Sequence, residues 1–238
     1  MPPRTLQPEL MDDPALDAES HAGALRGLAR INRVCRAADA LWPYVEHALS
    51  SIPISSPAPL SLLDLATGSA DVPIELARRA RKAGHPLDVS ACDASRTALA
   101  IAADRAREAN VSLALQQRDV VADGLSHVDA SVDIVTCSLF LHHLTESDVV
   151  GVLASMRRVA RKLALVSDLR RCPIGLAAAH IAGRVLTRSP VVRIDAVRSV
   201  RAAFTESELR RLANSAGMTE ARIVRQWPFR MLMVWMRP

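Results

Sequence analysis

The segment Ser61–Asp71, S-L-L-D-L-A-T-G-S-A-D, constrains the fold more than any other part of the chain. Apolar residues lead up to Asp64, small residues form a turn, and a helical pattern with Pro73 in its first turn follows. This order of strand, small-residue loop and helix start is typical of open α/β sheets, which bind nucleotides where the first strand ends. The segment therefore predicts an α/β domain that binds a nucleotide.

The same segment indicates which kind of nucleotide binds. A dinucleotide fingerprint, G-x-G-x-x-G, would require glycine at Ala66, Gly68 and Asp71. Asp71 would place a negative charge at the helix N-terminus, where the pyrophosphate binds. An acid there favours a cofactor without phosphate that carries positive charge, and S-adenosylmethionine has both a sulfonium and an α-ammonium.

Asp64–Ala70 resembles the first motif of the class I S-adenosylmethionine-dependent methyltransferases, commonly acid-x-G-x-G-x-G. Gly68 keeps the middle glycine, and the other two are replaced by Ala66 and Ala70, which narrows the freedom of the loop backbone. The resemblance covers about residues 60–238. It implies an α/β fold with a Rossmann-like seven-stranded methyltransferase sheet, mostly parallel with a terminal antiparallel strand, and helices on both faces.

The pattern after this loop alternates strands and helices, which predicts a parallel sheet with right-handed crossovers. The expected strands are Leu87–Cys92, Val111–Gln117, Ser131–Ser138 and Arg161–Asp168, and the expected helices are Ser95–Asn110, Thr145–Ala160 and Pro173–Leu186. A capping box at Thr205–Glu208 opens a further helix. Met218–Trp227 and Phe229–Met236 lie too close together for anything but a hairpin, which supplies the antiparallel end of the sheet.

The chain divides into three parts. Residues 1–20 are rich in proline and acids and are expected to form a flexible arm, and residues 21–59 are expected to form an N-terminal helical lid and a Ser/Pro linker. By resemblance, residues 60–238 are expected to form the methyltransferase domain, in which residues 170–203 would be an insertion that covers the acceptor. Simple packing of the N-terminal helix against the sheet is the alternative to a lid.

Three acids fall at successive strand ends, at Asp64, Asp93 and Asp119, with Asp123 as a rival for the last. By resemblance, Asp64 faces the methionine ammonium through the loop, Asp93 takes the ribose diol, and Asp119 with Val120 takes the adenine edge. A carboxylate can accept two hydroxyl donors side by side, which suits the ribose. The full set expected to bind the cofactor is Asp64, Ala66, Thr67, Gly68, Asp93, Ala94, Asp119, Val120 and Ser138.

The fourth strand leads into Ser138–Leu144, S-L-F-L-H-H-L. This stretch lacks the N/D-P-P-Y/F motif with which methyltransferases grip an amine, and resembles that of small-molecule methyltransferases. His142, and after it His143, are candidate general bases for a hydroxyl acceptor. The alternative is that both histidines only pack against the cofactor loop.

The insertion combines an apolar helix with many arginines, of which Arg170 and Arg171 lie nearest the end of the fifth strand. This composition favours a lipophilic acceptor with an acidic or phenolic head, which Arg170 or Arg171 would bind. A phenol or quinone precursor of polyketide type, and hence secondary metabolism, is the expected substrate class. The run Glu9–Pro14 also looks similar to methyltransferases of such bacterial pathways. A dimer face or a peripheral membrane contact is the alternative use of this surface.

Composition and cysteine spacing argue against several other classes of protein. The net charge is +5, but the chain has no basic run interleaved with aromatics, so no nucleic acid is expected. The four cysteines are far apart, which predicts reduced thiols, a cytoplasmic location and no metal site. No apolar run reaches the roughly 18 residues of a membrane span, and no signal peptide is apparent.

Two other functions remain open at this level. One is a nicotinamide-dependent reductase on a similar sheet, against which Asp71 and the terminal hairpin argue. The other is a non-catalytic binding protein with the cofactor fold, which Ala66 and Ala70 suggest. Whether the protein is a monomer or a homodimer is also open.

Overall fold

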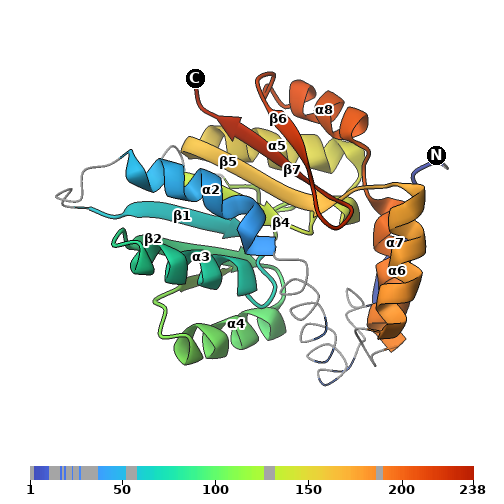
Figure 1. The fold of residues 1–238 in the computed structure, drawn as a ribbon, viewed down its shortest axis with the longest axis horizontal. Helices are drawn as coiled ribbons and strands as arrows, with labels where there is room; N and C mark the ends of the chain where they lie inside the picture. Colours follow the sequence, from blue (N-terminus) through green and yellow to red (C-terminus); the bar gives the residue numbers. More distant parts are fainter. Residues whose placement is uncertain are drawn as a thin grey trace.

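Seven strands form one sheet in the order β3-β2-β1-β4-β5-β7-β6 (Figure 1). The computed structural model describes residues 3–10, 17, 19, 23, 27, 37–51, 58–125, 132–185 and 190–238. The strands are β1 (Leu60–Leu65), β2 (Leu87–Asp93), β3 (Ala114–Gln117), β4 (Val132–Ser138), β5 (Ala160–Leu169), β6 (Arg222–Gln226) and β7 (Arg230–Met236).

The sheet confirms the expected fold. The pairs β1–β2, β1–β4, β2–β3 and β4–β5 are parallel, whereas β7 runs antiparallel between β5 and β6. The carboxyl ends of β1, β2, β4 and β5 therefore meet at one edge, where parallel α/β sheets place their ligands.

Helices cover both faces of the sheet (Figure 1). One face carries α5 and α8, whose apolar residues join the core with β4 and β5. The other carries α2 and α3, with α4 packed beside α3. The helices are α2 (Ala37–Ser50), α3 (Asp71–Lys82), α4 (Arg96–Glu108), α5 (Glu146–Val159), α6 (Pro173–Val185), α7 (Pro190–Ala202) and α8 (Glu206–Ser215).

The helix α2 comes from the segment expected to form a lid. Its buried residues Leu41, Val45 and Leu49 pack with Leu62 of β1 and Leu76 of α3. This part of the segment is thus a layer of the core. Most of residues 21–36 lie outside the described residues, and the lid stays a prediction for them. None of the described helices has the length and apolar character needed to cross a bilayer.

The cover insertion forms two neighbouring helices, α6 and α7, which stand beyond the carboxyl edge of the sheet (Figure 1). Residues 3–10 lie against α7. The backbone N–H of Thr5 donates to the carbonyl of Arg201 at 3.1 Å, and that of Leu10 donates to Asp195 Oδ1 at 2.8 Å. Residues 3–10 thus have hydrogen-bond partners on α7. Most of residues 11–20 lie outside the described residues, and the flexible arm stays a prediction.

Candidate active site

The loop after β1 has a left-handed backbone at three alternating positions. The φ angles are 49° at Ala66, 56° at Gly68 and 56° at Ala70. These are the three glycine positions of the expected motif, so the loop keeps the glycine conformation although two residues carry a Cβ. The backbone N–H of Thr67 donates to the carbonyl of Cys92 at 3.0 Å, which fixes the loop against β2.

This conformation leads to a first prediction. An L-residue with a side chain pays about 1–2 kcal/mol in the left-handed region, whereas glycine does not. Glycine also raises the conformational entropy of the unfolded chain, which lowers the free energy of unfolding by about 0.4–1 kcal/mol and offsets part of this gain. We therefore expect Ala66→Gly and Ala70→Gly each to raise the free energy of unfolding by about 0.5–1 kcal/mol, measured by urea denaturation. Ala77→Gly, inside α3, is the control and should lower it.

Asp64 is buried just below the loop and is 2% exposed. Its carboxylate accepts hydrogen bonds from Thr67 Oγ1 at 2.7 Å and from Thr136 Oγ1 at 2.5 Å. Burial raises the pKa of Asp64 to about 7, although both hydroxyls oppose the rise. The sequence analysis missed Thr136, whose only signal is a polar residue inside the apolar strand β4.

Asp93 joins the end of β2 to the loop. Its Oδ2 accepts the backbone N–H of Gly68 at 2.8 Å, and its Oδ1 accepts that of Ser95 at 2.8 Å. The structure thus brings Asp64, Gly68 and Asp93 together, as expected from their positions at the ends of β1 and β2. Ala94 follows on the exposed side of the same turn.

Asp119 lies in a turn after β3. Its Oδ1 accepts the backbone N–H groups of Val121 and Ala122 at 2.9 and 3.1 Å, and its own N–H donates to Asp123 Oδ2 at 3.1 Å. Val120 is buried. The two rival acids therefore form one turn, in which Asp119 shapes the backbone that a cofactor would meet.

The end of β4 carries two marks of a binding site. Ser138 Oγ is buried and has no hydrogen-bond partner among the described residues. Leu139 has a φ of 55°, rare for a residue with a side chain, and its N–H donates to the carbonyl of Ser167 at 2.8 Å. A buried hydroxyl without a partner and an unusual backbone angle are common where a ligand binds.

His142 lies at the same edge, in the short helix η2 (Leu141–His143), and is 3% exposed. Its Nδ1 lies 2.6 Å from Asp168 Oδ1, and its backbone N–H donates to Asp168 Oδ2 at 3.0 Å. Burial lowers the pKa of His142, but the charge of Asp168 and the hydrogen bond with it outweigh this effect and raise the pKa to about 10. A histidine that already carries its proton at neutral pH does not take one from a substrate.

Both histidines face Glu9 of the N-terminal segment. Glu9 Oε1 lies 3.5 Å from His142 Nε2 and 3.9 Å from His143 Nε2. Arg4 holds the same segment in place, donating to the carbonyls of His142 at 3.1 Å and Leu144 at 2.7 Å. The sequence analysis missed Glu9, because no spacing links it to residues so far along the chain.

Arg170 and Arg171 both meet acids of α8. The buried guanidinium of Arg171 pairs with Glu208, and its Nε donates to the carbonyl of Ala203 at 3.0 Å. The Nη1 of Arg170 lies 3.8 Å from Glu206, and its buried Nε has no hydrogen-bond partner among the described residues. Arg171 therefore holds the cover to α8, whereas Arg170 retains a donor that a ligand could use.

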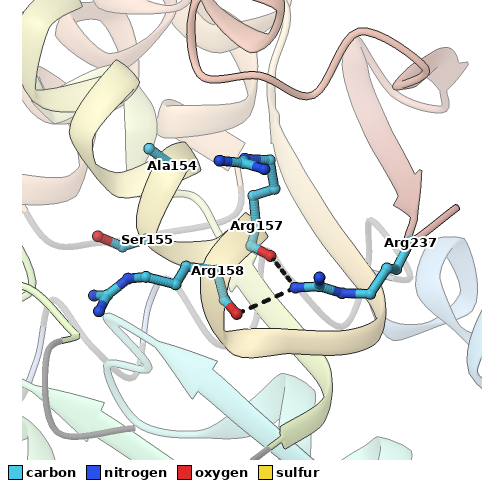
Figure 2. A pocket seen from close by; sticks show the side chains of 5 residues that line it. All are labelled: Ala154, Ser155, Arg157, Arg158 and Arg237. Carbon is cyan, nitrogen blue, oxygen red and sulfur yellow. Dashed lines mark hydrogen bonds between the residues drawn. The ribbon is translucent and has the colours of Figure 1, made fainter. Parts of the chain in front are cut away.

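A pocket lies at the C-terminal end of α5 and is lined by Ala154, Ser155, Arg157, Arg158 and Arg237 (Figure 2). Arg237 lines it and donates from Nη2 to the carbonyls of Arg157 and Arg158 at 2.7 and 3.2 Å, and from Nε to that of Ala160 at 2.9 Å. Arg157 and Arg158 lie in the last turn of α5, where the carbonyls lack partners within the helix, so Arg237 closes the helix end. None of the expected site residues lines this pocket.

Comparison with known proteins agrees with this geometry. A family model described as a methyltransferase domain matches residues 62–162, a range that includes the loop, Asp93 and both histidines. No curated protein is significantly similar to the chain in sequence.

Solved structures resemble the fold at low sequence identity. A SAM-dependent methyltransferase from Aquifex aeolicus has a TM-score of 0.58 at 16% identity, covering 93% of this chain and 98% of that one. Magnesium protoporphyrin IX methyltransferase (ChlM) from Synechocystis PCC 6803 with bound SAH has a TM-score of 0.56 at 15% identity, covering 93% and 100%. A candidate O-methyltransferase from Nostoc punctiforme PCC 73102 has a TM-score of 0.55 at 15% identity. The match covers 83% of this chain but only 56% of that protein, so this chain spans little more than half of its length.

Proposed function

We propose that the chain is a class I S-adenosylmethionine-dependent methyltransferase, as the match of the methyltransferase-domain model to residues 62–162 supports, and that it methylates a small lipophilic acceptor at a hydroxyl oxygen. The observation that carries the proposal is the contact between the loop after β1 and the end of β2. There the N–H of Gly68 donates to Asp93 Oδ2 at 2.8 Å, beside the buried Asp64. This contact at the carboxyl edge supports a site for a nucleoside with a charged tail.

The cofactor is S-adenosylmethionine, which supplies an electrophilic methyl group on a sulfonium. The residues at the edge fit it. Asp64 can balance the α-ammonium through Ala66–Gly68, and Asp93 with Ala94 offers acceptors for the ribose hydroxyls. Val120 provides an apolar surface for the base beside Asp119. The hydroxyl of Ser138 has no hydrogen-bond partner among the described residues and can bond to the cofactor.

The acceptor is a hydroxyl compound in this proposal because the residues after β4 contain no proline pair to grip an amine. The cover helix α6 is apolar and exposes Ile174 and Ile181, which suits a lipophilic body. Such a body is a phenol or quinone precursor of polyketide type, which would place the protein in secondary metabolism. The free thiols of Cys92, Cys137 and Cys172 fit a reducing cytoplasm.

The catalytic role expected for His142 and His143 takes a different form in this proposal. Their Nε2 atoms face Glu9 rather than an open surface, so we assign them to positioning the cover and arm over the acceptor. Alignment of acceptor, methyl group and sulfur can supply roughly 7–11 kcal/mol of the barrier without a general base.

Arg170 gives a direct test of acceptor binding. A guanidinium near a phenol stabilises the phenolate, which makes it the better nucleophile. We expect Arg170→Ala to raise KM for a phenolic acceptor about tenfold, the loss of one charge-assisted hydrogen bond of about 1.5 kcal/mol. Arg225→Ala is the matched control because Arg225 pairs with the same Glu206 from a more exposed position. Equal KM values for the two variants would remove Arg170 from the acceptor site.

The function itself is tested by calorimetry and by a panel of acceptors. We expect S-adenosylhomocysteine to bind and NADH not to bind. With labelled S-adenosylmethionine, lipophilic phenols should accept the methyl group in preference to amines. Transfer only to tRNA or protein would contradict the proposal, and binding of neither nucleotide would favour a non-catalytic protein.

A further inference from the structure

Glu9, His142 and His143 bring three ligand atoms together at the carboxyl edge of the sheet. One oxygen or nitrogen from each side chain lies within 4.8 Å of the others. The carboxylate comes from the N-terminal segment and the imidazoles from η2, so the contact joins two distant parts of the chain. The side chains of Glu9 and His142 are 6% and 4% exposed.

The distances among these atoms are those of loose ion pairs rather than of close ones. A charge-assisted hydrogen bond between nitrogen and carboxylate is about 2.7–2.9 Å long, whereas Glu9 Oε1 lies 3.5 Å from His142 Nε2 and 3.9 Å from His143 Nε2. Two ligands that each lie about 2.0–2.1 Å from a tetrahedral ion are about 3.3 Å apart. The two separations from Glu9 approach those of ligands that share one metal ion, and the three ligand atoms, which lie within 4.8 Å of one another, would have to move inward to complete the site.

The hydrogen-bond partners of these ligands are also of the kind found around metal sites. A histidine that ligates through one nitrogen usually gives its other N–H to a carboxylate, which fixes the tautomer and the ring. Asp168 Oδ1 lies 2.6 Å from His142 Nδ1, and the N–H of Leu169 donates to the same oxygen at 2.7 Å. The hydroxyl of Ser199 donates to Glu9 Oε1. Both buried ligands are thus oriented by fixed partners.

Charge and donor type select the class of ion. Glu9 and Asp168 are two buried carboxylates, and a divalent cation beside them would balance their charge. Two imidazoles and one carboxylate favour zinc and similar transition metals, whereas Mg²⁺ and Ca²⁺ prefer sites of oxygen ligands.

We propose that Glu9, His142 and His143 bind a divalent transition-metal ion of the zinc type, which fastens the N-terminal segment to the carboxyl edge of the sheet. Three protein ligands leave one coordination position for water. The sequence analysis expected no metal site, because it sought cysteines and regular spacings, and these ligands come from two separate stretches. The inference does not depend on which acceptor is methylated.

The test uses the full chain without a histidine tag, stripped with a chelator and titrated with Zn²⁺ at neutral pH in a calorimeter. We expect one ion to bind per chain. X-ray absorption should show only nitrogen and oxygen ligands at about 2.0–2.1 Å, and no sulfur at about 2.3 Å, which excludes the cysteines. Zn²⁺ should also protect the N-terminal segment from limited proteolysis.

Variants separate this site from adventitious binding. Asp168→Asn should weaken Zn²⁺ binding about 10- to 100-fold, as loss of an orienting partner does, and Glu9→Gln and His143→Ala should weaken it further. His180→Ala, which removes an exposed histidine on α6, should leave it unchanged. Circular dichroism checks the fold of each variant. If His143→Ala unfolds, Glu9→Gln alone tests the site. An unchanged affinity in Glu9→Gln, a sulfur ligand, or no binding by the wild type would overturn the proposal.

Discussion

Replacing Asp93 with alanine should weaken binding of S-adenosylhomocysteine about 10- to 150-fold, which corresponds to the roughly 1.5–3 kcal/mol of a hydrogen bond to a charged group. The carboxylate at this position does two things. It holds the N–H groups of Gly68 and Ser95, and it is the acceptor that we assign to the ribose. Its removal therefore loosens the loop and deletes a contact to the cofactor. Calorimetry at constant pH measures the change.

Two further variants of β2 sharpen this experiment. Asp93→Asn keeps the shape and one acceptor but loses the charge, and it should fall between wild type and alanine. Asp88→Ala removes an exposed acid from the other half of the same strand and should bind like wild type. An Asp93→Ala protein that melts normally and binds S-adenosylhomocysteine with unchanged affinity would show that the ribose acid lies elsewhere.

Asp64 should make stability depend on pH. Its pKa is raised by burial to about 7 in the folded protein, whereas an aspartate in an unfolded chain titrates near 3.9. For a raised pKa, the contribution to stability is fully present below the unfolded value and is lost as pH rises through about 7. Asp64→Asn carries an amide that does not titrate. Between about pH 5 and pH 8 the wild type should lose roughly 2–4 kcal/mol relative to this variant.

Urea denaturation of both proteins across this range measures the difference. Parallel curves would show that Asp64 ionises in the folded protein at its ordinary pKa. A saturating amount of S-adenosylhomocysteine should reduce the loss at high pH, because its α-ammonium favours the ionised carboxylate. The same ligand should have no such effect on the pH dependence of Asp64→Asn.

The structure also separates the two arginines expected at the acceptor. The sequence placed Arg170 and Arg171 together after β5, and they are neighbours in the chain. Arg171 reaches Glu208 and Ala203, whereas the Nε of Arg170 has no hydrogen-bond partner in the described part of the chain. No local pattern distinguishes the two side chains, because the difference depends on α8, which follows much later.

The sequence by itself determined the sheet, its antiparallel end and the proximity of Asp64, Gly68 and Asp93 at the ends of β1 and β2. Each of these rests on a local signal: period-two or helical spacing, small residues in a turn, and acids at strand ends. Once parallel topology is set, the carboxyl ends of neighbouring strands must meet, so residues at those ends become neighbours without further information.

Only the tertiary structure decided what lies around these three residues. Thr136 reaches Asp64 across two strands, and Glu9 reaches His142 from the start of the chain. These contacts join residues that are far apart in sequence and follow no fixed spacing. They form because a buried polar group needs a partner and takes the one that packing provides. Residues 3–10, which look polar and loose in sequence, thus find their partners on α7 and η2.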